Sequence, residues 1–172
     1  MNGIKHRVVL SFGGNHDNTL HCFNKAIEKI EKKIGDVIIV SSIYSTQAWG
    51  MNKDTRDFLN NIVVIHTHLK PKKLLKATQK IEIKLGRKTK SINEEYKDRP
   101  IDIDILFYDD LIINKKKLII PHQLLHTRKF ILEPLSEIIP DYIHPLLKKT
   151  IKELLLSCTE KLKVKKLQIE KE

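Results

Sequence analysis

The chain has 172 residues, of which 41% are hydrophobic and 31% charged, and apart from a formal net charge of +11 this composition is ordinary for a soluble globular domain. No stretch approaches the ~20 apolar residues of a membrane helix, and the N-terminus lacks an apolar signal segment. The two cysteines, Cys22 and Cys158, lie far apart and near no histidine cluster, which argues against a zinc site or a disulfide framework. We therefore expect a cytoplasmic protein with one domain over residues 1–160 and a charged, weakly packed tail over 161–172.

The first part of the chain predicts a strand, a helix and a second strand. Residues 7–12 form an apolar run that ends at two glycines, and residues 19–34 place apolar side chains at helical spacing. Gly35 is a natural stop for this helix. Residues 37–44 are rich in β-branched side chains, which favours a second strand, and a polar stretch follows over 45–57.

The next elements are a third strand, a second helix and a fourth strand. Residues 58–66 predict the third strand. Pro71 suits the first position of a helix, whose apolar period continues as far as Gly86. A polar loop over 87–98 then leads into a fourth strand over 101–108.

The order β-α-β-β-α-β predicts an α+β fold of the ferredoxin-like type, in which four antiparallel strands form the core sheet and two helices cover one face. A hairpin and closing helices complete the domain, over 109–120, 130–138 and 150–161. Neither an internal repeat nor a low-complexity linker divides the chain. Because ferredoxin-like sheets also serve as RNA-binding modules, the architecture alone does not decide the function.

The most informative feature of the sequence is a pair of aspartates inside the fourth strand. Side chains alternate between the faces of a strand, so Asp102 and Asp104 share one face, with Cα atoms roughly 6.5 to 7 Å apart, while the isoleucines between and beside them point into the core. Two like charges on one face repel each other unless a cation lies between them or water solvates them. The pair therefore indicates either a site for a divalent metal or the solvated outer face of a half-buried strand.

The positive charge is unevenly divided between lysine and arginine. A basic chain raises the hypothesis of nucleic-acid binding, but the lysines are spread in a way that equally suits solvated helix faces and turns. Where lysine is the usual surface cation, arginine is expected where its planar fork grips phosphate or carboxylate. The chain has five arginines, Arg7, Arg56, Arg87, Arg99 and Arg128. The last three of these lie near the aspartate pair or in the segments that flank it.

The segment over 99–106 resembles the signature of the 6-hydroxymethyl-7,8-dihydropterin pyrophosphokinase family of folate biosynthesis. That signature is an arginine, two spacers, Asp, an aliphatic residue, Asp and two aliphatics, here from Arg99 through Asp102 and Asp104. Further segments match the family in the same order, so that the resemblance runs from about residue 7 to about residue 155: 11–15, 41–46, 58–61, 79–87 and 121–130.

The resemblance implies transfer of a pyrophosphoryl group from ATP to the hydroxymethyl group of the reduced pterin, with release of AMP, by a monomer that binds small molecules and no nucleic acid. It implies two Mg²⁺ ions on Asp102 and Asp104. The catalytic residues would be Arg87, Arg99, Asp102, Asp104, His122 and Arg128. The ATP-binding residues would be Gln79, Glu82, Arg87, Arg99, Ile105, Lys117, His122 and Arg128. The pterin-binding residues would be Thr46, Ala48, Trp49, Phe58, Asn60, Asp102 and Phe130, with the two phenylalanines enclosing the ring.

Each of these residues also has an ordinary structural interpretation. In that interpretation the two phenylalanines are core residues, and Asn60 makes local hydrogen bonds. His122 caps a loop, and Glu82 forms an exposed salt bridge. The sequence departs from the family at three aromatic or loop positions, Phe58, Thr89 and Tyr96, and in the flanks of Arg99. Two other functions stay open: a metal-dependent phosphohydrolase or nucleotidyl enzyme on the same scaffold, and a basic RNA-binding module, which would survive loss of the aspartates and weaken steeply with salt.

Overall fold

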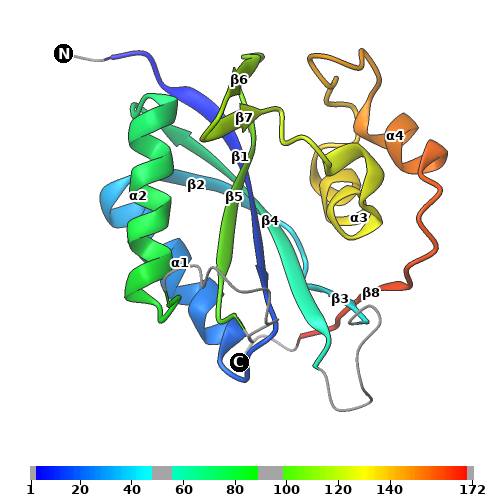
Figure 1. Ribbon diagram of the computed structural model, residues 1–172, viewed down its shortest axis with the longest axis horizontal. Helices are drawn as coiled ribbons and strands as arrows, with labels where there is room; N and C mark the ends of the chain where they lie inside the picture. The colour runs from blue at the N-terminus through cyan, green and yellow to red at the C-terminus, as the bar shows by residue number, and fades with distance from the viewer. Residues whose placement is uncertain (1–2, 48–55, 89–98, 170–172) are drawn as a thin grey trace.

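The computed structural model describes residues 3–47, 56–88 and 99–169. It has an antiparallel sheet with helices on both faces (Figure 1), and the predicted ferredoxin-like α+β fold is confirmed. In chain order the elements are β1 (His6–Gly14), α1 (Thr19–Lys33), β2 (Gly35–Val40), β3 (Tyr44–Thr46), β4 (Phe58–Thr67), α2 (Pro71–Lys84), β5 (Asp102–Tyr108), β6 (Ile113–Lys115), β7 (Leu118–Ile120), the 3-10 helix η1 (Leu125–Thr127), α3 (Lys129–Ile138), α4 (Ile151–Ser157) and β8 (Val164–Lys166).

The sheet has β1 and β4 at its centre. β5 pairs with the other side of β1, while β2 and β3 pair with the two ends of β4, all antiparallel. The prediction of one continuous second strand over 37–44 is therefore wrong, because the strand is broken between Val40 and Tyr44. At the break the Ser41 hydroxyl oxygen accepts a hydrogen bond from the Ile62 N–H at 2.8 Å, and the Ser42 N–H donates to the carboxylate of Glu137 at 2.9 Å. The Ser41 N–H still donates to the Ile62 carbonyl at 2.9 Å, so side-chain contacts supplement the backbone bonds at the break.

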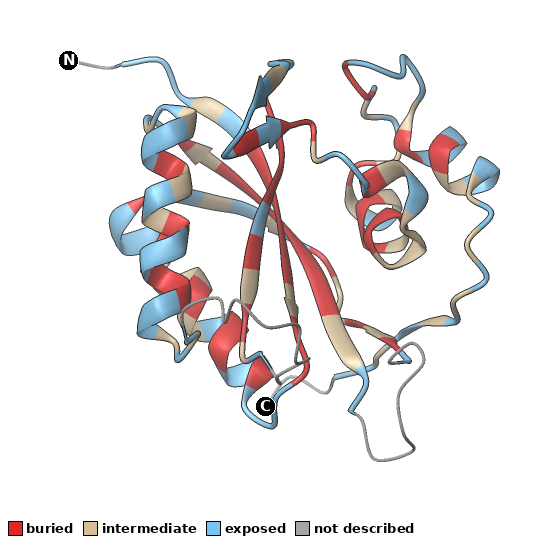
Figure 2. Ribbon diagram, viewed as in Figure 1, coloured by how far each residue is buried: buried red, intermediate tan, exposed pale blue. Residues whose placement is uncertain are grey.

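Each face of the sheet has its own hydrophobic core. On one face α1 and α2 pack against alternate residues of the central strands, such as Leu10 and Val63. On the other face α3 and α4 pack against the residues between them, such as Val9 and Val64. Figure 2 shows buried positions along the central strands and on the helix faces turned toward the sheet. The two closing helices therefore cover the second face of the sheet (Figure 1).

The C-terminal tail was predicted to pack weakly, and for Val164–Lys166 this is wrong. These residues form β8, which pairs antiparallel with β3, and the Leu167 N–H donates to the Ile43 carbonyl at 2.8 Å. β8 pairs with the edge of β3 that β4 does not occupy, and the exposed lysines of β8 make the new outer edge polar.

Within 3–47, 56–88 and 99–169, no helix combines the length and the hydrophobicity needed to cross a bilayer. Cys22 and Cys158 are both free thiols, the first buried and the second half-buried.

Candidate active site

The aspartate pair lies where the alternation of the strand predicts it. Ile103 and Ile105 are 4% and 5% exposed and belong to the core beneath α1 and α2. Asp102 is half-buried and Asp104 is exposed, and both face the other side of the sheet. In the pairing with β1, Asp104 lies opposite Ser11. Two carboxylates thus stand side by side at the start of β5.

A row of paired residues runs from the aspartates across the sheet. Asp102 lies opposite Gly13 of β1, Gly13 lies opposite Asn60 of β4, and Asn60 lies opposite Tyr44 of β3. Two strand spacings, about 10 Å, therefore separate Asp102 from Asn60. Gly13 has no side chain to fill the interval, and a Cβ there would come within 3.1 Å of the Asn60 Oδ1. The row therefore has an acidic end and an amide end, and the residue between them bears no side chain.

The amide end gathers the described residues that were predicted to bind the pterin from β3 and β4. Asn60 is 8% exposed, and its Nδ2 donor has no hydrogen-bond partner within the described chain. Thr46 lies opposite Phe58 in the same strand pair, and its hydroxyl donates to the Phe58 carbonyl at 3.4 Å. Phe130, in the first turn of α3, is half-buried, as is Phe58. Ala48 and Trp49 lie outside the described residues.

Glu82 and Arg87 brace the acidic end from α2 and the turn after it. The Glu82 side chain is 4% exposed, accepts a hydrogen bond from the Ile103 N–H at 2.6 Å and pairs with Arg87 at 2.6 Å. Arg87 also reaches the Asp102 Oδ1 at 3.2 Å. Burial raises the pKa of Glu82, and the Ile103 and Arg87 contacts oppose the shift. The interpretation of Glu82 as an exposed salt-bridge residue is therefore wrong, and both of its carboxylate oxygens are engaged by the protein.

A second arginine contacts the acidic pair from the chain that enters β5. Arg99 approaches the Asp102 Oδ2 at 3.2 Å. Its backbone N–H donates to the Asn15 Oδ1 at 2.8 Å, and its carbonyl accepts from the Asn15 N–H at 3.0 Å. Asn15, which is 6% exposed, thus holds the turn that carries Arg99. The sequence contains this asparagine within the family-like segment 11–15, but gives no sign of its partner.

His122 and Arg128 lie beside Asp104, and of the two Arg128 carries a permanent positive charge. The His122 N–H donates to the Leu106 carbonyl at 3.0 Å, which aligns this segment with β5. Desolvation raises the pKa of Asp104, as does the charge of Asp102, while His122 and the arginines oppose the shift. Burial lowers the pKa of His122, and Asp104 opposes that shift. The guanidinium of Arg128 lies 5.7 Å from the ring centroid of Phe130, which connects the charged end with the aromatic residue on α3.

The chemistry of this acidic end fits magnesium better than zinc. The Asp102 Oδ1 is buried and has no hydrogen-bond donor within the described chain, although Arg87 neutralises its charge. No group of three or more His, Cys, Asp or Glu side chains able to hold a metal occurs among residues 3–47, 56–88 and 99–169. Mg²⁺ is commonly bound by one or two carboxylates together with waters and substrate phosphates, whereas zinc sites take three or four protein ligands.

Three other predicted ATP residues have side chains that are exposed or turned into the core. Gln79 is exposed on α2, and Lys117 is exposed in the turn between β6 and β7. Figure 1 shows that hairpin at the end of β5 opposite to its start. The Ile105 side chain is buried under α1 and α2, which leaves only its backbone for a ligand on the aspartate face. Their roles stay predictions.

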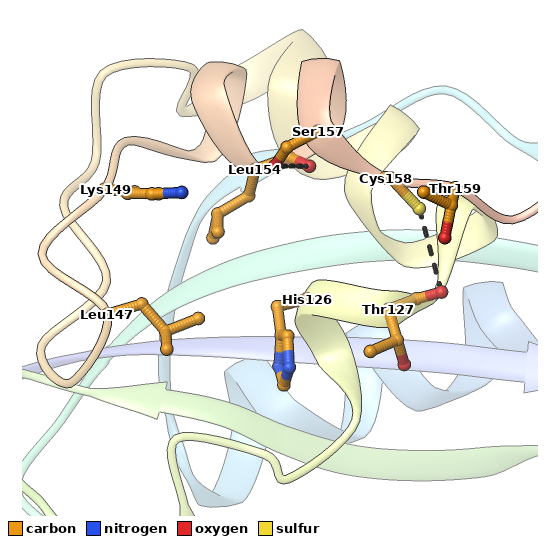
Figure 3. A pocket seen from close by; sticks show the side chains of 8 residues that line it. All are labelled: His126, Thr127, Leu147, Lys149, Leu154, Ser157, Cys158 and Thr159. Atoms are coloured by element: carbon orange, nitrogen blue, oxygen red, sulfur yellow. Dashed lines mark hydrogen bonds between the residues drawn. The ribbon is translucent and has the colours of Figure 1, made fainter.

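A pocket of about 310 Å³ lies elsewhere, between η1 and α4. Figure 3 shows its lining side chains, none of which was predicted to bind a substrate: His126, Thr127, Leu147, Lys149, Leu154, Ser157, Cys158 and Thr159. Cys158 is held by a contact from its thiol to the Thr127 carbonyl at 3.7 Å. The pocket has no carboxylate and is separate from the aspartate pair.

Solved structures support the fold. A Plasmodium falciparum HPPK-DHPS chain superposes with a TM-score of 0.73 over 90% of this chain, at 22% sequence identity. A second structure from this group, also of Plasmodium falciparum HPPK-DHPS, gives a TM-score of 0.74 at 21% identity. This chain covers only 43% and 46% of those longer chains, so the likeness concerns the fold of one part of them.

Sequence comparison identifies the family. A protein of Aquifex aeolicus named 2-amino-4-hydroxy-6-hydroxymethyldihydropteridine pyrophosphokinase is 38% identical over 146 residues, which are 85% of this chain and 88% of the relative. A Porphyromonas gingivalis protein of the same name is 37% identical over 139 residues, which are 80% of this chain and 93% of the relative. The family model for 7,8-dihydro-6-hydroxymethylpterin-pyrophosphokinase matches residues 9–140. The chain therefore belongs to the 7,8-dihydro-6-hydroxymethylpterin-pyrophosphokinase family.

Proposed function

We propose that this chain transfers the pyrophosphoryl group of ATP to the hydroxymethyl group of 6-hydroxymethyl-7,8-dihydropterin and releases AMP, as a step of folate biosynthesis. Membership of the family and the names of the relatives support the reaction. The observation that carries it is the row of paired residues across the sheet, with Asp102 at one end, Asn60 at the other and a glycine between them.

The amide end of the row is suited to the pterin. A flat heterocycle with donor and acceptor edges needs a fixed hydrogen-bonding partner and apolar surfaces for its faces. Asn60 offers a buried donor that has no partner among the described residues, and Thr46 offers a hydroxyl on the neighbouring strand. In this proposal Phe58 and Phe130 enclose the ring, and Ala48 and Trp49 complete the slot.

The acidic end of the row is suited to the triphosphate. Arg87, Arg99 and Arg128 provide guanidinium groups for phosphate oxygens, and His122 provides a ring nitrogen. The Glu82 carboxylate keeps Arg87 beside Asp102, which fixes the direction of one of these groups. Holding charge at fixed positions around the reacting phosphoryl group is the main catalytic contribution in phosphoryl transfer.

We propose that Asp102 and Asp104 hold two Mg²⁺ ions, which neutralise charge on the phosphate oxygens when bound. Of the two carboxylates, Asp104 is the better acceptor for the proton of the attacking hydroxyl, because Arg87 and Arg99 already contact the two oxygens of Asp102, and because desolvation and the charge of Asp102 raise the pKa of Asp104. The hydroxyl oxygen then attacks the β-phosphorus, and AMP leaves.

The predicted monomeric and cytoplasmic state belongs to the same proposal. Among residues 3–47, 56–88 and 99–169, no helix is long and apolar enough to cross a membrane. Light scattering of the purified protein at micromolar concentration tests the monomer, which should give the mass of one 20.1 kDa chain.

The experiment that tests the function measures AMP released from ATP and Mg²⁺ with and without 6-hydroxymethyl-7,8-dihydropterin. Release should depend on the pterin and should vanish in Asp104→Ala, while the matched variant Asp110→Ala, an exposed aspartate beyond the end of β5, should keep it. Formation of ADP or of inorganic phosphate would contradict the proposal. Salt-sensitive RNA binding that survives Asp104→Ala would favour the RNA-binding module instead.

A further inference from the structure

Glu137, near the end of α3, connects three segments of the chain. Its Oε1 accepts hydrogen bonds from the Ser42 N–H and the Ser42 hydroxyl, each at 2.9 Å. Its Oε2 accepts from the Tyr44 hydroxyl at 2.6 Å and pairs with Lys166 of β8 at 3.6 Å. We call Glu137, Ser42, Tyr44 and Lys166 the Glu137 clamp. None of these residues belongs to the predicted site.

The Glu137 carboxylate at the centre of the clamp is ionised. The Glu137 side chain is 23% exposed, and burial alone would raise its pKa, but the hydrogen bonds from Tyr44 and Ser42 and the charge of Lys166 lower it. Its carboxylate is therefore charged at neutral pH. Hydrogen bonds to a charged acceptor are the shorter and stronger kind.

One end of the clamp fixes β3, which carries the pterin side of the row. Tyr44 is 7% exposed and lies opposite Asn60, and Thr46 follows two residues later on the same face. The strand is broken just before Tyr44, so the β2 ladder does not extend to β3. β3 is therefore positioned by its own pairing with β4, by β8 on its other edge, and by the contacts of Ser42 and Tyr44 with Glu137.

The other end of the clamp fixes α3. Phe130 lies in the first turn of this helix and Glu137 seven residues later. Seven residues make almost two turns, so both side chains leave the same side of the helix, about 10 Å apart along its axis. A contact that holds Glu137 against β3 therefore also limits the separation between Phe130 and the strands that carry Thr46, Phe58 and Asn60.

From this geometry we infer that Glu137 is a positioning residue that sets the width of the pterin slot, acting through Tyr44 and β3. The inference rests on the proposed function, because it takes the space between Phe130 and the Asn60 end of the row as the slot. It also gives the C-terminal strand a role, since Lys166 lies beyond residues 9–140, which the family model matches.

The test compares Glu137→Gln and Tyr44→Phe with the full-length wild type by calorimetric titration with 6-hydroxymethylpterin and, separately, with Mg-ATP. Small displacements of a binding residue have large effects, and we expect the pterin Kd to rise about 10-fold or more in both variants while the ATP Kd changes less than about 2-fold. Amide hydrogen exchange over 42–46 should speed up in both.

The control is Glu153→Gln in α4, which also removes a carboxylate that accepts two hydrogen bonds, from the Thr150 N–H at 2.7 Å and from its hydroxyl at 3.0 Å. This variant should have a lower Tm than the wild type and should bind pterin and Mg-ATP with the wild-type Kd values. If Glu137→Gln does not fold, Tyr44→Phe decides, because it removes a single hydroxyl.

An unchanged pterin Kd in a folded clamp variant would overturn the inference, as would equal weakening of pterin and ATP, which indicates a merely structural role. The proposed function fails separately: it fails if the wild type releases no pterin-dependent AMP. A wild type that is active while its clamp variants bind pterin normally would overturn the clamp alone.

Discussion

Two adjacent asparagines in β4 allow the pterin assignment to be tested against stability. Asn60 and Asn61 are 8% and 1% exposed, and each has a buried polar atom without a hydrogen-bond partner in the described chain, Nδ2 in the first and Oδ1 in the second. Side chains alternate along the strand, so Asn60 faces the same side as the aspartates, and Asn61 faces the core beneath α1 and α2. The two sites are chemically alike and differ in the side of the sheet that they face.

Leucine has the branched shape of asparagine without its polar atoms. A buried polar group without a partner destabilises the fold by about 1–3 kcal/mol. Asn60→Leu and Asn61→Leu should therefore each raise stability by about 1–2 kcal/mol, which corresponds to a rise in Tm of roughly 2–8 °C for a domain of this size. Asn60→Leu alone should weaken pterin binding, by about 100-fold or more, because the heterocycle then faces no partner.

Thermal unfolding followed by circular dichroism measures the first effect, and calorimetric titration with 6-hydroxymethylpterin measures the second. Asn61→Leu is the control: it should gain stability and keep its pterin affinity. The reasoning is refuted if Asn60→Leu binds pterin as the wild type does, or if both variants weaken binding equally. A clear loss of stability in both would refute the assignment of unpaired polar atoms.

Three further outcomes are expected. Arg87→Lys should lower kcat by about 10-fold or more, because a single ammonium group cannot bridge Glu82 and Asp102 as the planar fork does; steady-state AMP release measures this, and an unchanged kcat would contradict it. Thr150→Ala removes the side-chain cap of α4 and should lower stability by about 1 kcal/mol in urea unfolding without changing kcat. The pKa of Glu137 is lower in the folded protein than its ordinary value of 4.5, so its contribution to stability is present above that pH and is lost as the pH falls through the lowered pKa. The difference in unfolding free energy between the wild type and Glu137→Gln should thus be largest at neutral pH and shrink in acid; a difference that grows in acid would contradict the clamp.

The elements with a strong local pattern could be predicted from the sequence. Alternation placed the isoleucines of β5 in the core and the two aspartates on the other face, which the burial of Ile103 and Ile105 confirms. The helical period and Pro71 fixed the start of α2. These predictions succeeded because periods of 2 and 3.6 residues are properties of a single segment.

The features that sequence reasoning missed depend on contacts between distant segments. The break before Tyr44 follows from hydrogen bonds to Ile62 and Glu137, which lie 21 and 95 residues from their partners. β8 forms because β3 has a free edge, and its own lysine-rich sequence favours a solvated tail as much as a strand. Glu82 lies among lysines in the sequence, yet it is buried because α2 turns its side chain toward β5, where the Ile103 N–H donates to its carboxylate.

The central claim, attack of the pterin hydroxyl on the β-phosphorus of ATP beside Asp102 and Asp104, is tested most directly with ATP radiolabelled at the β-phosphorus. In the presence of Mg²⁺ and 6-hydroxymethyl-7,8-dihydropterin, the account predicts that the label moves to the pterin product while the AMP formed stays unlabelled, and that Asp104→Ala transfers none. Label that remains in ADP, or that appears as free pyrophosphate without the pterin, would contradict it.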